Sequence, residues 1–157
     1  MNWRTIGFGV HGARTFPQVA LRDPDWLFWA CESADNLLRD AVLFGQAKLV
    51  RDRASRIKIP NDPQGRLVAR YVISNGRFAG LQIVPRDTPS HEGWGHQEIE
   101  RPFIDLGLPR KLQPYDKRGG ALLLSEVKPR LFPGANRLSM KLCNDFFENE
   151  SNFVTSA

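Results

Sequence analysis

A group of charged residues in the second half of the chain has the types and spacing of a phosphodiester-cleaving site. An apolar run at 122–124 leads to Glu126 and Lys128, and Asp105 and Asp116 precede it. Two carboxylates can hold Mg²⁺, and a lysine can orient water or stabilise the charge that develops on phosphorus. If the segment is a strand, alternation places Glu126 and Lys128 on one face. The pattern therefore defines one hypothesis, a small nuclease with Mg²⁺ as its cofactor.

That arrangement resembles the Asp…Glu-x-Lys site of the restriction-endonuclease-like nucleases. Glu-x-Lys is also common in proteins that are not nucleases, and here Pro129 comes directly after it. We therefore favour a non-enzymatic protein and keep the nuclease as an alternative. Whether Glu126 and Lys128 have this spacing by chance is left open.

The histidines and cysteines do not have metal-binding spacing. His91 and His96 lie one residue further apart than the histidines of the His-Glu-x-x-His motif, and the Gly- and Pro-rich segment 85–97 predicts a long loop instead of the helix that this motif needs. Cys31 and Cys143 are far apart in the sequence. We predict no metal site and, outside the nuclease alternative, no cofactor. Separate thiols suit a reducing compartment, although a single disulfide between them is also compatible.

The charge balance favours a polyanionic partner such as DNA or RNA. The formal net charge is +5 and the sequence pI is about 9.6. Basic residues crowd positions 48–58 and recur to position 86, where they predict salt-sensitive contacts to phosphate. The candidate nucleic-acid-binding residues are Arg14, Lys48, Arg51, Arg53, Arg56, Lys58, Arg66, Arg70, Arg77 and Arg86.

The N-terminal segment carries the most specific pattern in the chain. From Phe8 it reads Phe-Gly-Val-His-Gly-Ala-Arg-Thr, then Val19, and then Asp-Pro-Asp-Trp-Leu-Phe-Trp up to Trp29. This segment, residues 8–29, resembles a small module found at the C-terminus of exodeoxyribonuclease X-like exonucleases. The family has lysines where this chain has Val10 and Gly12. The resemblance implies a nucleic-acid setting, while the contact itself is expected from the basic residues between Lys48 and Arg86.

The same segment also has a structural interpretation. Asp23 can cap a helix whose first turn holds Pro24. Trp26 and Trp29 then lie on one helical face, where they either form the core of a small turn-helix unit or leave an aromatic ring free. The aromatic residues that could stack on an exposed base are Trp3, Phe8 and Trp26.

Three further segments indicate how these residues are positioned. The spacing of apolar residues predicts a long amphipathic helix over 35–58, and the breaker-rich segment that begins at Pro60 ends it. Asn75-Gly76 between two β-rich runs predicts a hairpin of 67–74 with 78–84. We expect a short edge strand within 99–106, a buried strand at 121–128 and a helix near the C-terminus.

These elements predict an α+β fold, in which an N-terminal turn-helix unit and the long helix pack on a mostly antiparallel sheet. We expect a turn-helix and helix region at 1–58, a β-rich region at 66–148 and a flexible tail at 149–157. No run reaches the about 18 apolar residues of a membrane span, and no apolar signal run comes after Met1, so we predict a cytoplasmic protein without a membrane partner.

The favoured function is a nucleic-acid-associated binding or accessory protein within a larger nucleic-acid-processing or ribonucleoprotein assembly, with a protein partner. The alternatives are the Mg²⁺-dependent nuclease and a protein-interaction module or inhibitor that does not contact nucleic acid.

Overall fold

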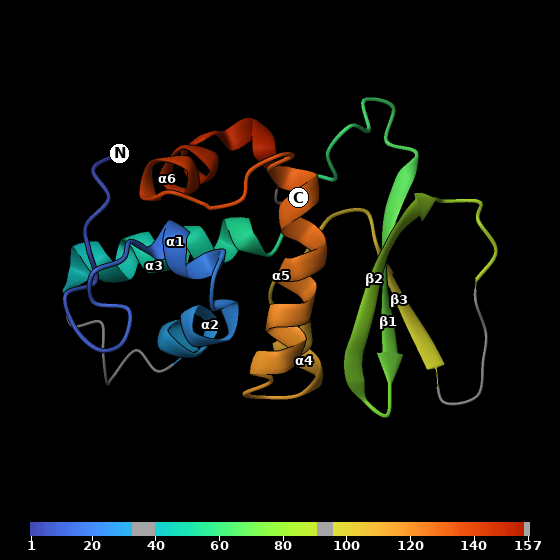
Figure 1. Ribbon diagram of the computed structural model, residues 1–157, viewed down its shortest axis with the longest axis horizontal. Coiled ribbons are helices and arrows are strands. Elements are labelled where there is room, and N and C mark those ends of the chain that lie inside the picture. Colours follow the sequence, from blue (N-terminus) through green and yellow to red (C-terminus); the bar gives the residue numbers. More distant parts are fainter. Residues whose placement is uncertain (33–39, 91–95, 156–157) are drawn as a thin grey trace.

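Helices and one antiparallel sheet occupy different parts of the molecule, which confirms the predicted α+β class. The computed structural model describes residues 1–32, 40–90 and 96–155. The helices are α1 (Phe16–Ala20), α2 (Pro24–Glu32), α3 (Ala41–Ala54), α4 (Leu108–Leu112), α5 (Lys117–Leu131), α6 (Met140–Glu148) and the short 3₁₀ helix η1 (Glu150–Asn152); the strands are β1 (Leu67–Ser74), β2 (Arg77–Pro85) and β3 (His96–Arg101). Figure 1 shows α1, α2, α3 and α6 on one side, the sheet on the other, and α4 and α5 between them.

The N-terminal unit forms as its sequence predicts. Backbone hydrogen bonds from Ile6 to Arg14 and from Gly7 to Gly12 close a tight loop, and Gly9 takes a positive φ of 71° at its tip. Helix α2 begins at Pro24, and the Trp26 amide donates to Asp23 Oδ1 at 3.3 Å.

Helix α3 confirms the core of the predicted long helix. Its N-cap is Asp40, whose carboxylate accepts from the Val42 amide at 2.8 Å, and it ends at Ala54, before the predicted end at residue 58. The chain then extends, and Ile57 forms isolated bridges with Ile104 and Phe153. The predicted first turn of this helix, at 35–39, lies outside the described residues.

The predicted hairpin is confirmed in detail. Strands β1 and β2 pair antiparallel, and Asn75 and Gly76 have φ angles of 52° and 77°, as a type I′ turn requires. Strand β3 pairs with the other edge of β1, so the strand order is β2-β1-β3. The predicted edge strand at 99–106 begins earlier, at His96, and ends at Arg101 because Pro102 cannot donate to the ladder.

The predicted strand at 121–128 is wrong, because this segment lies in helix α5. Leu123, Leu124 and Val127 are buried at the i, i+1 and i+4 spacing of one helical face, and Asp116 caps the helix. Pro129 is exposed in the last turn and does not end the helix, which continues to Leu131.

Helix α5 is also the long helix that covers the sheet. It contacts β2, whereas α3, which was expected there, packs against α1 and α2. The predicted arrangement of the long N-terminal helix on the sheet is therefore wrong, although the fold class is right.

The expected flexible tail is packed against the helices as far as it is described. Phe153 is only 3% exposed, and its ring lies 5.4 Å from that of Phe146 and 5.6 Å from that of Phe147. The Val154 amide donates to Arg56 O at 2.9 Å. Aromatic burial and backbone pairing thus order residues 149–155.

Both cysteines are buried and free, so the disulfide alternative is wrong. None of the helices in the described ranges combines the length and the apolarity that a membrane span requires.

Candidate phosphate-binding site

The residues of the nuclease hypothesis occupy separate structural positions. Glu126 Oε2 accepts from the Leu81 amide at 2.7 Å, which ties α5 to the sheet. Because residues two apart on a helix point roughly 200° apart, Lys128 faces elsewhere. The hypothesis required both side chains on one strand face, and the helix separates them.

The two aspartates of that hypothesis hold the backbone. Asp116 Oδ1 accepts from the Gly119 amide at 2.9 Å as the cap of α5. Asp105 accepts from the Gly107 amide and from Lys111 Nζ, both at 2.8 Å. In the described ranges, no group of three His, Cys, Asp or Glu side chains is arranged to hold a metal ion. The His91 part of the rejected zinc motif lies outside those ranges, and His96 begins β3.

Some of the predicted basic residues stabilise the fold. Arg53 and Arg56 donate to the backbone oxygens of Phe147 and Val154 and so hold the C-terminal segment. Arg70 is only 4% exposed and pairs with Glu100 at 3.1 Å. These three arginines are structural residues rather than a stripe that faces a ligand.

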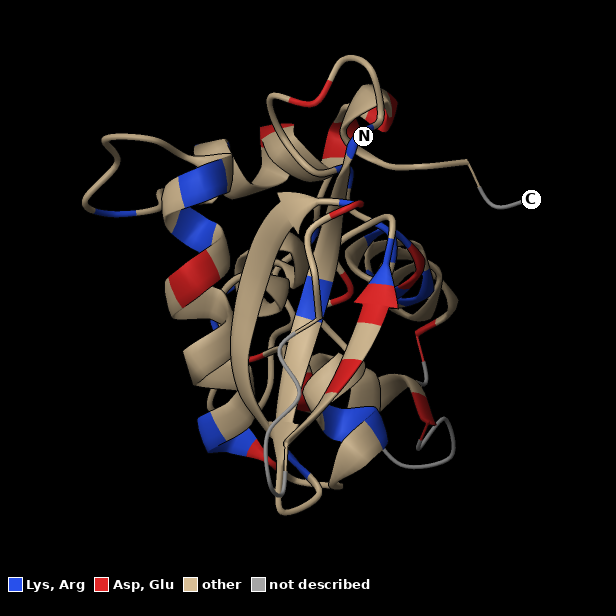
Figure 2. Cartoon of the chain, turned by 90° about the vertical axis from the view of Figure 1, so that its right-hand side faces the viewer, with Lys and Arg blue, Asp and Glu red and all other residues tan. Residues whose placement is uncertain are grey.

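The remaining predicted cations are not gathered into one stripe. Lys48 and Arg51 lie on α3, with Lys48 Nζ 4.6 Å from the centre of the Phe44 ring. Arg66 and Arg86 share one end of the β1–β2 hairpin, Arg77 lies at the other end, and Lys58 comes after α3. Figure 2 shows basic and acidic residues interspersed along α5 and β3 instead of being separated onto different faces.

The three candidate stacking rings pack against the core. Trp3, Phe8 and Trp26 are each partly buried there. Trp26 meets the His11 ring edge-on at 5.1 Å and the Trp29 ring at 6.3 Å. The structural interpretation of these aromatics is therefore the one that the geometry favours.

The N-terminal signature positions one cation, Arg14. The Arg14 guanidinium donates to His11 Nδ1 at 3.1 Å and to Val10 O at 3.2 Å. With Nδ1 acting as an acceptor, Nε2 carries the imidazole proton and donates to Asp23 Oδ2 at 3.0 Å. His11 is only 5% exposed, so this chain of hydrogen bonds fixes Arg14 at the edge of the unit.

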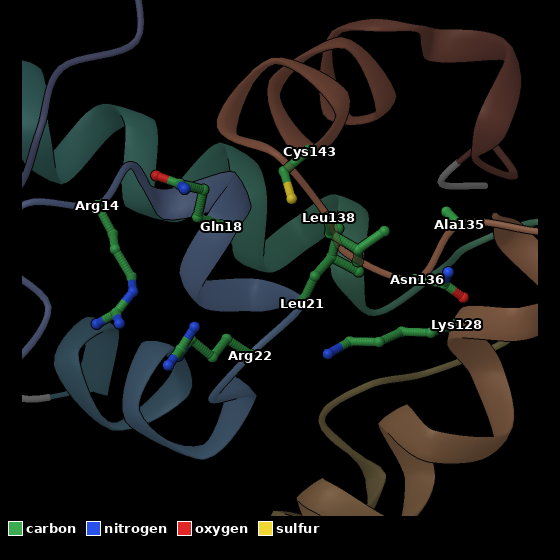
Figure 3. Close-up of a pocket in the computed structure, with 9 residues that line it drawn as sticks. All are labelled: Arg14, Gln18, Leu21, Arg22, Lys128, Ala135, Asn136, Leu138 and Cys143. Atoms are coloured by element: carbon green, nitrogen blue, oxygen red, sulfur yellow. The ribbon is translucent and has the colours of Figure 1, made fainter.

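Arg14 borders a cavity of about 160 Å³ between α1, α5 and α6 (Figure 3). The cavity brings together residues that are far apart in the sequence. It is lined by Arg14, Gln18, Leu21, Arg22, Lys128, Ala135, Asn136, Leu138 and Cys143. Figure 3 shows the Lys128 side chain extended toward the segment that carries Arg22, and the Cys143 thiol directed into the same space.

The cavity is positively charged. Arg14, Arg22 and Lys128 line it, and no Asp or Glu does so within the described ranges. Burial lowers the pKa of the Lys128 ammonium, and the Arg22 charge lowers it further, while Cys143 acts in the opposite direction. Neither Arg22 nor Lys128 forms an ion pair with a residue that the structure describes. Two like charges therefore face one space without a counter-ion from the fold.

The other lining groups include amide hydrogen-bond donors. Gln18 Oε1 accepts from the Thr15 amide at 3.0 Å, which leaves the Gln18 NH₂ group as a donor. Asn136 offers a second amide. Burial raises the pKa of Cys143 to about 11, so its thiol is neutral and adds no negative charge.

The sequence predicts part of this site. It indicates Arg14 as a nucleic-acid-binding residue and Lys128 as a candidate catalytic residue, whereas no sequence pattern singles out Arg22. Arg22 directly precedes the predicted helix start at Asp23-Pro24, and its proximity to Lys128 depends on how α5 packs. No local pattern in the sequence predicts that these two residues lie close together.

Comparison of the chain with protein-family models, with curated proteins and with solved structures gives no match.

Proposed function

We propose that the protein binds nucleic acid through phosphate contacts centred on the cavity of Arg14, Arg22 and Lys128, as an accessory protein of a larger nucleic-acid-processing assembly. The observation that carries this proposal is the uncompensated positive charge of that cavity. Guanidinium groups bind phosphate in a two-pronged geometry and an ammonium binds it as a point charge, so the donor set suits phosphate chemistry.

The N-terminal resemblance supports the same proposal independently. The segment that resembles a module of exodeoxyribonuclease X-like exonucleases contains Arg14, and its His11 and Asp23 hold that arginine at the cavity. The family's other lysine positions are Val10 and Gly12 here. In this chain Arg22 and Lys128, from outside the tight loop, supply cations in their place.

The test measures how strongly the protein binds fluorescent single-stranded and duplex DNA and RNA of one sequence. Binding is followed by fluorescence anisotropy at KCl concentrations from about 50 to about 200 mM, because contacts to phosphate weaken strongly over this range. Each phosphate contact contributes about 0.7–0.9 to the slope of log K against log salt. We expect Arg22→Gln and Lys128→Met each to weaken binding to every sequence and to lower that slope by about one contact.

Arg101→Gln is the matched control, because Arg101 is exposed at the end of β3, on the sheet side of the molecule away from α1 and α6 (Figure 1), and is not among the candidate nucleic-acid-binding residues. It removes the same charge, so a general electrostatic effect would reduce binding equally in both arginine variants. Absence of binding at the lowest salt concentration would refute the proposal. Equal losses in Arg22→Gln and Arg101→Gln would refute the cavity as the centre of binding.

A further inference from the structure

The cavity is small enough to hold one phosphate group. Its volume of about 160 Å³ has room for a few ordered water molecules or for one small anion. A phosphate inside a strand carries a nucleoside on both sides and needs two ways out. A phosphate at a strand end needs one.

The charge of the cavity also suits a terminal phosphate. An internal phosphodiester carries a single negative charge, whereas a phosphomonoester carries about −1.5 to −2 at neutral pH and has three acceptor oxygens. Arg14, Arg22 and Lys128 supply three positive charges around one small space. A dianion compensates this set more completely than a monoanion does.

The donors come from several elements of the fold. Arg14 and Gln18 come from the N-terminal unit, Lys128 from the last turns of α5, and Asn136 from the connection to α6 (Figure 3). Leu21, Leu138 and the neutral Cys143 thiol form the remaining wall.

We propose that the cavity recognises the terminal phosphate of a nucleic-acid strand, a phosphomonoester at the 5′ or 3′ end. This inference rests on the proposed function, because it assigns a specific chemical group to the same site. The rest of the strand leaves the cavity past exposed residues such as Arg137, which is adjacent to Asn136.

The experiment compares one labelled oligonucleotide sequence with a 5′-phosphate, a 3′-phosphate or hydroxyls at both ends. Binding is measured by anisotropy at one salt concentration within the range used above. A charge-assisted hydrogen bond contributes about 1.5–3 kcal/mol, so we expect one phosphate-ended form to bind about tenfold to a hundredfold more tightly than the hydroxyl form. Arg22→Gln and Lys128→Met should remove this preference, and Arg101→Gln should keep it.

The outcomes separate the two proposals. Salt-sensitive binding that is equal for all three ends would overturn the terminal-phosphate inference and leave nucleic-acid binding intact. Loss of all binding at low salt would overturn both. Inorganic phosphate and a phosphoserine peptide serve as competitors. Displacement by the peptide at a lower concentration than by the phosphate-ended strand would overturn the assignment to nucleic acid. Circular dichroism checks that the Lys128→Met and Arg22→Gln variants are folded, and Arg22 is exposed in the native chain.

Discussion

Two adjacent glycines in the first turn of α5 should respond oppositely to the same substitution. A Cβ on Gly119 would lie 2.3 Å from Asp116 Oδ2 and 2.8 Å from its Cγ, whereas a Cβ on Gly120 would meet only Pro24 Cγ, at 3.7 Å. Asp116 is 5% exposed and its carboxylate caps the helix through the Gly119 amide. Gly119→Ala therefore forces the capping carboxylate to move, and Gly120→Ala does not.

These contacts set the magnitudes. Loss of an N-cap bond costs about 1 kcal/mol, and a buried carboxylate without a donor costs about 1–3 kcal/mol. Alanine is favoured over glycine inside a helix by up to about 1 kcal/mol. We expect Gly119→Ala to destabilise the protein by about 1–2 kcal/mol and Gly120→Ala to stabilise it by about 0.5–1 kcal/mol. Because a domain of this size shifts by about 2–4 °C per kcal/mol, the two melting temperatures should differ by roughly 3–12 °C.

Thermal unfolding monitored by circular dichroism measures this difference. The control is the same pair of substitutions in an Asp116→Ala background, where the obstructing carboxylate is gone. There the penalty of Gly119→Ala should disappear, and the two variants should melt together. A Gly119→Ala variant that melts at or above Gly120→Ala, or a penalty that persists without Asp116, would refute the steric argument.

Two further predictions concern buried charges and thiols. The Arg110 guanidinium lies 2.9 Å from the carboxylate of Asp25, which is 5% exposed, and 2.8 Å from that of Glu32. Arg110→Ala should lower the free energy of unfolding in urea by about 3–5 kcal/mol, because it leaves the buried Asp25 carboxylate without its partner, whereas Glu32→Ala should lower it by under about 1 kcal/mol. Equal losses in the two variants would contradict this ranking. Burial raises the pKa of Cys31 and Cys143 from 9.0 to about 11. The unfolded chain therefore loses these protons first, so the thiol contribution to stability is complete below pH 9 and declines between pH 9 and 11. Replacing both thiols with alanine should remove that part of the decline; an unchanged decline would contradict the assignment.

The parts of the fold that the sequence predicts well are encoded by neighbouring residues. The Asn75-Gly76 turn requires two positive φ angles, and both residue types adopt them readily. Asp23-Pro24 combines a capping side chain with a ring preset for the first helical turn. Such elements are recognisable because the physical cause lies within a few residues.

The predictions from sequence are wrong where tertiary contacts determine the local structure. The run at 122–124 is too short to show a strand or a helix period, and the cap at Asp116 with the buried face of α5 makes it a helix. Phe153 looks like an isolated apolar residue in a polar tail, but Phe146 and Phe147 provide a surface that covers it. Neither the packing of α5 nor that of the tail is visible in a local window of sequence.

Two arginines with little exposure elsewhere in the molecule have carboxylate partners, whereas the described residues that line the cavity include no carboxylate. Arg70 is paired with Glu100 and Arg110 with Asp25, in keeping with the rule that a buried cation needs a partner. At the cavity, Lys128 is partly buried near Arg22, and no carboxylate lines the space within the described ranges. The fold neutralises its structural cations and leaves this set uncompensated. A bound anion would supply the missing negative charge, and for that reason the phosphate contact is proposed here rather than along α3.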